Sequence, residues 1–249
     1  MSALRIDRDG EILRVTLARP DVRNAFDAGL IAELAEAFVD VGKARAVVLA
    51  GDGPSFCAGA DVEWMRASAE LSYDENLEDA MGLRRMLEAV DRCPAPVVAR
   101  VQGHALGDGA GLVACADIVL SHPDTVFAFS EVKLGIVPAV ISPYALAKIG
   151  PSAARRYFLT GERFDAGTAL RIGLVHEVAP DLDGALDRVL GELLSAGPRA
   201  ARAAKRLVLD APLDAQETAR RIAERRTSDE GQEGLRAFLE KRRATWRGR

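Results

Sequence analysis

The sequence is poor in cysteine, and this scarcity excludes some classes of protein. Its three cysteines, Cys57, Cys93 and Cys115, are odd in number and lack CxxC spacing. A disulfide framework or a structural zinc site normally shows an even set of cysteines or closely spaced pairs. The pattern therefore predicts no metal site and a reducing, cytoplasmic setting.

Long hydrophobic runs and a strong net charge are also lacking. No stretch approaches the roughly 20 apolar residues of a membrane span, and residues 1–8 do not form the apolar run of a signal peptide. The formal net charge of -4 creates no global field that attracts nucleic acid or anionic lipid. The basic segment 241–249 is short and lies in an acidic chain. We therefore expect neither a membrane nor a nucleic-acid partner.

The chain has 249 residues, of which 49% are hydrophobic, enough for one large core or for a main domain with an appendage. Apolar runs of strand length alternate with segments of helical period, and the last third is helical throughout. The pattern predicts strands at 12–17, 46–50, 97–101, 117–120 and 126–129, and helices at 76–90, 142–149, 153–159 and 183–195. A further helix follows the N-cap Asp27, with Leu30, Ile31, Leu34, Phe38 and Val41 on its apolar face. This order predicts an α/β core with a C-terminal helical extension.

Two glycine-containing segments, residues 56–61 and 105–111, each follow a buried strand. Ligands of α/β proteins collect at the carboxyl ends of such strands. Because Gly59, Gly107, Gly109 and Gly111 lack a Cβ, a ligand can approach the backbone and meet its N–H groups. Two such donors that converge on one carbonyl oxygen form an oxyanion hole, in which each donor contributes about 2.7–4 kcal/mol. Tight turns and close helix packing are the alternative interpretation.

Further motifs occur in a defined order along almost the whole chain. They are Arg23-Asn24-Ala25, the two glycine-containing segments, residues 130–138, Leu159-Thr160-Gly161-Glu162, Gly173-Leu174-Val175 and residues 238–243. Their order and spacing resemble those of the crotonase (enoyl-CoA hydratase/isomerase) superfamily. The resemblance implies a crotonase/ClpP-like α/β fold, with a β-β-α spiral core and an acyl-CoA pocket in residues 1–195. It also implies a helical region at 196–249 that makes the subunit contacts of a homotrimer or of a hexamer built as a dimer of trimers.

The resemblance assigns a role to each residue of the site. The backbone N–H groups of Ala60 and Asp108 match the oxyanion donors, although the family commonly has Gly where this chain has Asp108. Gly111 stands at the position of the first of two hydratase glutamates, and Glu131 matches the second, which makes Glu131 the expected catalytic residue. A carboxylic acid in an apolar pocket has a raised pKa, which suits proton delivery near neutral pH. The alternative is that Glu131 is a surface or helix-capping charge.

For coenzyme A, which enters as part of the substrate and not as a cofactor, the resemblance points to two groups of residues. Arg23 and Ala25 are expected near the phosphates and pantetheine, and the backbone of Ala58, Asp61 and Val62 near the adenine. Phe238 and Lys241, on the last helix, are expected to reach the nucleotide of a neighbouring subunit. For Arg23 and Lys241, a solvated surface charge is the alternative. His104 and Cys57 flank the site without a triad partner at a recognisable spacing, so we expect His104 to be a structural hydrogen-bonding residue.

Residues 59–65 and 130–144 resemble the bacterial methylglutaconyl-CoA hydratase branch, which also tends to have Gly at the first glutamate position. The implied reaction is addition of water to a 2-enoyl-CoA thioester. The resemblance extends this expectation to branched substrates such as 3-methylglutaconyl-CoA. Two alternatives stay open. One is a double-bond isomerase that uses Glu131 alone, and the other is an acyl-CoA-binding homologue with little or no activity.

Overall fold

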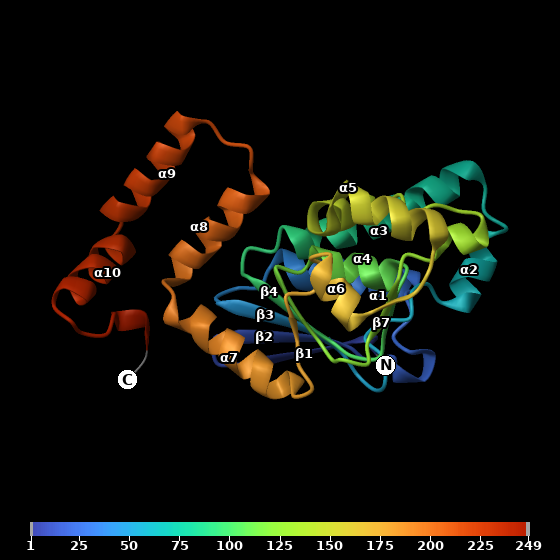
Figure 1. Cartoon of the computed structure of the whole chain (residues 1–249), viewed down its shortest axis with the longest axis horizontal. Coiled ribbons are helices and arrows are strands. Elements are labelled where there is room, and N and C mark those ends of the chain that lie inside the picture. Colours follow the sequence, from blue (N-terminus) through green and yellow to red (C-terminus); the bar gives the residue numbers. More distant parts are fainter. Residues whose placement is uncertain (1, 248–249) are drawn as a thin grey trace.

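The computed structural model describes residues 2–247, so Met1 and the last two residues of the basic C-terminal segment lie outside it (Figure 1). Its strands are β1 (Leu4–Asp9), β2 (Ile12–Leu17), β3 (Ala46–Gly51), β4 (Val97–Val101), β5 (His104–Leu106), β6 (Ile118–Ser121), β7 (Val126–Ala128), β8 (Phe164–Asp165) and β9 (Glu177–Val178). Its α-helices are α1 (Ala28–Val39), α2 (Val62–Ser68), α3 (Tyr73–Asp91), α4 (Asp108–Cys115), α5 (Ser142–Thr160), α6 (Ala166–Arg171), α7 (Leu182–Ser195), α8 (Pro198–Leu209), α9 (Ala215–Thr227) and α10 (Asp229–Leu239). Short 3-10 helices are η1 (Pro20–Val22), η2 (Glu131–Leu134) and η3 (Thr245–Arg247).

Most of these strands form one sheet. Within residues 2–247 its order is β1-β2-β3-β4-β6-β9, and a smaller sheet has the order β5-β7-β8. In the larger sheet β1 and β2 pair antiparallel, whereas the other pairs are parallel. A parallel sheet of this kind is normally covered on both faces. The predicted α/β core is therefore confirmed.

Alternate residues of the central strands enter two different hydrophobic clusters. Val47 and Leu49 of β3 belong to the main cluster, which also contains the apolar faces of α1, α3 and α4. Ala46 and Val48, on the opposite face, pack with Leu186 and the other apolar residues of α7. Because successive strand side chains point to opposite faces, helices must cover both sides of this sheet. Figure 1 shows α7 on one side and α3, α4 and α5 on the other.

Most predicted elements are present, with shifted ends. The Asp27 side chain accepts a hydrogen bond from the N–H of Leu30 at 2.8 Å, which confirms the N-cap of α1. The helix predicted at 76–90 starts earlier, at Tyr73, because Ser72 and Glu75 form a capping box. The helices predicted at 142–149 and 153–159 form α5, which is interrupted at Gly150 (φ 67°). Asp117 and Phe129, placed in strands by the pattern, lie just outside β6 and β7.

The C-terminal helices α8, α9 and α10 form an arm that extends from the core (Figure 1). Phe238 lies on α10, as expected, and is 80% exposed. The placement of Lys241 on the last helix was wrong, because α10 ends at Leu239 and Lys241 has a left-handed φ of 51°. The division of the chain at Ser195 into a core and a contact region stays a prediction. Among residues 2–247, every helix is too short or too polar to cross a membrane.

Candidate active site

The two glycine-containing segments lie side by side. The N–H of Cys57 donates to the carbonyl of His104 at 2.9 Å, and the N–H of Leu106 donates to the carbonyl of Cys57 at 3.1 Å. Cys57 and Ala105 thus form a parallel bridge between the segments. Since the two segments leave this bridge in the same direction, Ala60 and the start of α4 lie on the same side of the molecule.

Glycine is required where these two segments approach each other. Gly59 has a φ of 97°, and a Cβ there would lie 3.0 Å from the carbonyl oxygen of Leu106. A Cβ on Gly109 would lie 2.5 Å from the carbonyl oxygen of Cys57. The missing Cβ atoms of Gly59 and Gly109 therefore make room for protein backbone, and the prediction that they make room for a ligand was wrong for Gly109, which lines no part of the neighbouring cavity.

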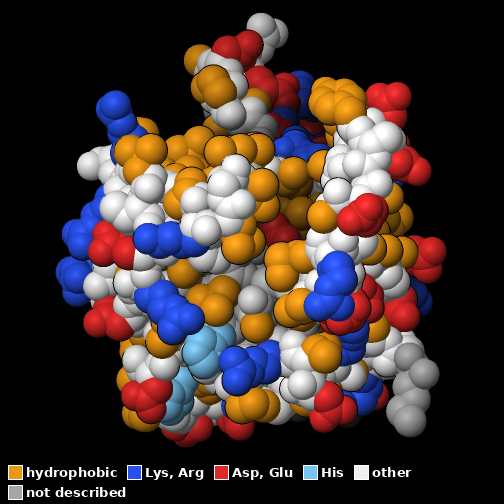
Figure 2. All heavy atoms as spheres, turned by 90° about the vertical axis from the view of Figure 1, so that its right-hand side faces the viewer, with side chains coloured by type: hydrophobic (Ala, Val, Ile, Leu, Met, Phe, Trp, Pro, Cys, Tyr) orange, Lys and Arg blue, Asp and Glu red, His pale blue; other side chains and the backbone are white. Residues whose placement is uncertain are grey.

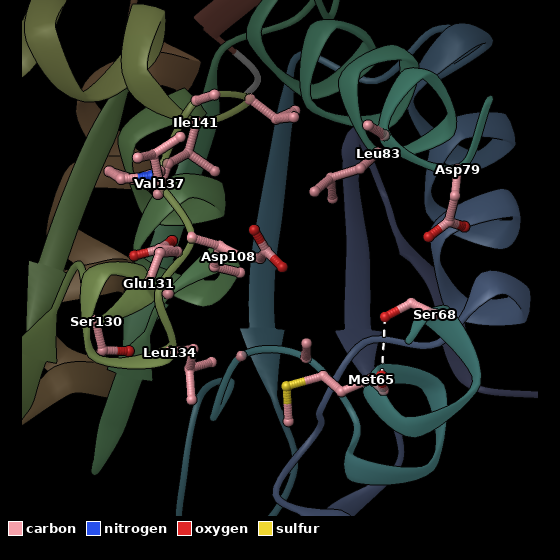
Figure 3. Close-up of a pocket in the computed structure, with 18 of the residues that line it drawn as sticks. Met65, Ser68, Asp79, Leu83, Asp108, Ser130, Glu131, Leu134, Val137 and Ile141 are labelled. Carbon is pink, nitrogen blue, oxygen red and sulfur yellow. Dashed lines mark hydrogen bonds between the residues drawn. The ribbon is translucent and has the colours of Figure 1, made fainter. Parts of the chain in front are cut away.

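A cavity of about 330 Å³ opens where the two segments end. Figure 2 shows the hollow on this face, with hydrophobic side chains around it and an acidic side chain inside. Figure 3 shows its walls, with Glu131 and Asp108 on one side and Asp79 and Leu83 of α3 on the other. The lining residues are Ala58, Gly59, Ala60, Trp64, Met65, Ser68, Asn76, Asp79, Ala80, Leu83, Gly107, Asp108, Ser130, Glu131, Leu134 and residues 136–141. A concave, mostly apolar site with a few polar groups is typical of a small-molecule pocket.

Both expected oxyanion donors line this cavity. Asp108 is the first residue of α4, so its N–H has no partner within the helix. Ala60 bridges Phe26, yet the two hydrogen bonds of that bridge use the carbonyl of Gly59 and the N–H of Asp61. Across residues 2–247, neither the Ala60 nor the Asp108 N–H donates a hydrogen bond. Both remain available to an acceptor in the cavity.

Glu131 begins η2 and reaches the cavity beside Gly107. A Cβ on Gly107 would lie 3.6 Å from Oε1 of Glu131. Both carboxyl oxygens of Glu131 are buried, and neither has a hydrogen-bond partner among the described residues. Burial, together with the charge of Asp108, raises the pKa of Glu131 to about 7. The alternative interpretation of Glu131 as a surface or capping charge is therefore wrong.

The Asp108 side chain also faces the cavity (Figure 3). Within the described part of the chain it makes no ion pair and no hydrogen bond, so its charge is not neutralised by a partner. Burial, and to a smaller extent the charge of Asp79, raises the pKa of Asp108 to about 6. The cavity therefore holds two carboxyl groups, Asp108 and Glu131, and both have a higher pKa than an exposed carboxyl group has.

Residues 7–249 match the family model described as "Enoyl-CoA hydratase/isomerase". The chain belongs to the enoyl-CoA hydratase/isomerase (crotonase) family. An acyl-CoA thioester is therefore the substrate class that the family indicates for this cavity.

Several solved structures and other relatives are similar over nearly the whole chain. An enoyl-CoA hydratase from Shewanella pealeana is 41% identical, with a TM-score of 0.94 and coverage of 98% of this chain and 96% of that one. Pseudomonas aeruginosa AtuE is 35% identical, with a TM-score of 0.94 and coverage of 99% and 100%. The cyclohexa-1,5-dienecarbonyl-CoA hydratase of Thauera aromatica is 31% identical over 255 residues, which cover 98% of this chain and 96% of that protein. These similarities confirm the predicted crotonase fold.

Gly111, at the position of the first hydratase glutamate, faces a filled space. A Cβ there would lie 2.3 Å from Cγ2 and 2.7 Å from Cβ of Ile141. Ile141 is 1% exposed and lines the cavity. The isoleucine therefore takes the room that a larger side chain at position 111 would need. Asp108 precedes Gly111 by three residues on α4, so both lie on one helix face.

The residues expected to contact coenzyme A fall into two separate groups. Arg23, Ala25, Ala58, Asp61 and Val62 surround the Gly59 segment, where the N–H of Ala58 donates to the carbonyl of Arg23 at 3.0 Å. Phe238 and Lys241 belong to the C-terminal arm, which leaves the core on the other side (Figure 1). One protomer therefore does not bring the two groups together. Their contacts with coenzyme A stay predictions.

The two other polar residues that the sequence singled out have structural roles. The Ser55 hydroxyl and Nδ1 of His104 lie 3.1 Å apart and form a hydrogen bond, which confirms the expectation for His104. Cys57 is fully buried, and this burial raises the pKa of its thiol to about 12. A thiol in this state is a poor nucleophile.

Sequence reasoning missed Arg19 and Asp79. The Arg19 guanidinium lies 2.9 Å from Asp27 and 3.1 Å from Asp61, and it donates to the carbonyl of Ala25. It thereby ties the start of α1 to the start of α2 beside the cavity. Asp79 lines the cavity from α3, far from either glycine-containing segment along the chain. Its sequence signal, one acidic residue among several on a polar helix, does not distinguish it from a solvated charge.

Proposed function

We propose that this protein is an enoyl-CoA hydratase-type lyase, which adds water across the C2=C3 double bond of a 2-enoyl-CoA thioester. One observation carries the proposal: among residues 2–247 the Glu131 carboxyl group has no partner, and it is buried in a cavity that two unengaged N–H groups also line. A raised pKa and the absence of a competing hydrogen bond leave this group free to act on a substrate.

In this mechanism the thioester oxygen accepts hydrogen bonds from the N–H groups of Ala60 and Asp108. The negative charge that develops on this oxygen, as C3 is attacked, is then stabilised by donors already in place. The Asp108 N–H belongs to the first turn of α4, whose dipole adds to this stabilisation.

Asp108 and Glu131 divide the proton transfers. With a pKa near 6, Asp108 is mostly ionised at neutral pH and accepts a proton from the attacking water, whose oxygen bonds to C3. With a pKa near 7, Glu131 retains a protonated fraction and delivers its proton to C2. The sum is one water added, with Asp108 left protonated and Glu131 left ionised, and exchange with solvent restores both. Asp108 thus acts from one turn before the position of the missing first glutamate.

A double-bond isomerase is the second candidate, and the filled space around Gly111 favours it. If Ile141 closes the position of the first acid and Asp108 takes no part, Glu131 alone can move a proton between C4 and C2 of a 3-enoyl-CoA. A homologue that binds acyl-CoA thioesters without turnover is the third candidate. The unpaired carboxylate of Asp108, which opposes negative charge on the thioester oxygen, favours it.

A panel of 2-enoyl-CoA and 3-enoyl-CoA thioesters, including 3-methylglutaconyl-CoA, separates these candidates. Hydration is followed by the loss of enoyl absorbance, and isomerisation by its gain. We expect Glu131→Gln to lower kcat for hydration by about 10²–10⁴-fold. Glu192→Gln, an exposed change on α7, is the matched control and is expected to keep full activity.

The Asp108→Asn variant assigns the reaction. Loss of hydration with this change supports the two-carboxyl mechanism, since the amide keeps the backbone donor and removes the base. Isomerisation that survives Asp108→Asn but not Glu131→Gln would establish the isomerase. Full activity of Glu131→Gln in both assays would overturn the catalytic assignment, and binding without any turnover would establish the third candidate.

A further inference from the structure

The walls of the cavity carry acidic side chains and no basic ones. Asp79, Asp108 and Glu131 all line it, whereas Lys, Arg and His are absent from its lining within residues 2–247. A cavity with these walls favours a neutral or positively charged occupant over an anionic one.

Asp79 lies opposite the two carboxyl groups used in the proposed reaction. It projects from α3, and Figure 3 shows it across the cavity from Asp108 and Glu131. The charge of Asp79 contributes to the raised pKa of Asp108, so the field of Asp79 extends across the cavity. A group placed between these walls meets negative charge from both sides.

The other polar groups of the α3 wall have already used their donors. The Ser68 hydroxyl donates to the carbonyl of Met65 at 2.9 Å. The Asn76 amide nitrogen lies within 3.1 Å of the carbonyl oxygens of Leu71 and Ser72, to which it donates. Asp79 adds a carboxylate, which only accepts, and the indole N–H of Trp64 already donates to it. This wall therefore offers acceptors to a bound molecule and holds back its donors.

The remaining part of the wall is apolar. Ala80, the next residue of α3, and Leu83, one turn further along, line the cavity beside Asp79. With the thioester at Ala60 and Glu131, where the proposed function places it, this wall is left to the acyl chain. The chain would pass hydrophobic side chains and meet a hydrogen-bond acceptor near Asp79.

We propose that Asp79 is a specificity-determining residue, which selects acyl chains with a hydroxyl group toward their far end and rejects chains that end in a carboxylate. A hydroxyl group donates to the Asp79 carboxylate, whereas a second carboxylate finds no donor and faces like charge. This inference rests on the proposed function for the position of the thioester. It places 3-methylglutaconyl-CoA, whose acyl group carries a carboxylate, among the poor substrates.

Binding of saturated acyl-CoA thioesters tests the inference without turnover. Hexanoyl-CoA, its 6-hydroxy derivative and adipoyl-CoA have equal chain lengths and differ only at the far end. By calorimetry with the full-length protein, we expect the hydroxy derivative to bind at least about tenfold more tightly than adipoyl-CoA, a difference that one well-placed charge can produce. Asp79→Asn, which keeps the shape and an acceptor oxygen, is expected to improve adipoyl-CoA binding by about tenfold.

Glu78→Gln is the matched control, because Glu78 precedes Asp79 on α3, pairs with Arg85 at 2.8 Å and is not part of the cavity lining. It removes the same charge from the same helix and is expected to leave all three affinities unchanged. Equal binding of adipoyl-CoA and the hydroxy derivative by the unmodified protein would overturn the inference, as would an equal response of Asp79→Asn and Glu78→Gln. Selective binding with no turnover of any 2-enoyl-CoA would overturn the proposed function and leave the inference standing.

Discussion

At the scale of single residues, Glu131 shows how a functional carboxyl group destabilises the fold that holds it. Its pKa is about 7 in the folded chain, against an ordinary value of 4.5. The folded state therefore binds this proton more tightly than the unfolded chain does. The favourable contribution is complete below about pH 4.5 and is lost as the pH rises through 7. Above that range, burial of the charged form opposes folding.

The Glu131→Gln variant should consequently gain stability only at high pH. At about pH 8 we expect its free energy of unfolding to exceed that of the unmodified protein by roughly 1–3 kcal/mol, because the amide has no charge to bury. At about pH 4, where Glu131 is protonated in both states, the difference should vanish. Urea unfolding of both proteins at the two pH values measures this difference in the free energy of unfolding. A difference independent of pH would show that the charge of Glu131 is not the cause.

A substitution at Gly111 tests how tightly Ile141 fills the space beside this glycine. The 2.3 Å approach of an added Cβ to Ile141 leads us to expect that Gly111→Ala lowers the free energy of unfolding. Overpacking of this kind typically costs about 1–3 kcal/mol. Combined with Ile141→Ala, the loss should be smaller than the sum of the two single losses, because the second change removes the clashing methyl group.

Gly191→Ala supplies the control for Gly111, since Gly191 lies within α7 and an added Cβ meets nothing within 4 Å. There we expect a gain of roughly 0.5–1 kcal/mol from the better helix propensity of alanine. Thermal unfolding of Gly111→Ala, Ile141→Ala, the double variant and Gly191→Ala measures these changes in stability. Strict additivity of the two changes at positions 111 and 141 would contradict the contact.

At the scale of elements, α8 is attached to the core by an ion pair. Lys205 Nζ lies 2.7 Å from Oδ2 of Asp117, and the Lys205 side chain is 5% exposed. The same carboxyl oxygen of Asp117 accepts a hydrogen bond from the N–H of Val97 at 2.7 Å. The start of the C-terminal arm is thus linked to the N-terminal ends of β4 and β6.

Lys205→Met should therefore weaken this attachment. We expect a loss of about 2–4 kcal/mol, because Asp117 keeps its charge in a partly buried place without its cation. Arg206→Met is the matched control, since Arg206 is the next residue on α8, its side chain is 56% exposed, and its distance to Asp210 is 3.7 Å. That change should stay within about 0.5 kcal/mol. Hydrogen exchange of α8 should rise for Lys205→Met alone, and equal effects of the two variants would contradict a specific anchor.

Sequence patterns identified β3 and β4 as short continuous apolar runs, and identified helices that have an apolar face and a polar face. The helix α1 shows this pattern and was found with its N-cap. By contrast, α4 was missed as a helix because its residues from Gly109 to Cys115 are all buried, so it has no polar face to reveal a period. The strand β5 has three residues, too few for a pattern. Glu131 was identified through resemblance, and Asp79 was missed because only the packing of α3 brings it to the cavity.

At the scale of the whole molecule, the C-terminal arm has apolar side chains without a covering partner. Phe238, Leu239 and Val208 are 80%, 76% and 77% exposed. Exposed apolar groups in this number are typical of surfaces that contact another chain. We therefore expect this arm to contact another subunit, and the homotrimer or hexamer, with Phe238 and Lys241 of one subunit near the nucleotide of the next, stays a prediction.

The double change Phe238→Asp with Leu239→Asp should therefore separate the subunits. Charged side chains at these positions would oppose burial of the arm, so we expect light scattering to show a smaller assembly than that of the unmodified protein. If Phe238 also contacts the neighbouring nucleotide, the KM for CoA thioesters should rise more than kcat falls. Tyr73→Asp, at an equally exposed residue (80%) at the start of α3, is the control and should change neither mass nor KM. An unmodified protein that is monomeric at all concentrations would refute the subunit contact, and loss of assembly without a change in KM would refute only the nucleotide contact.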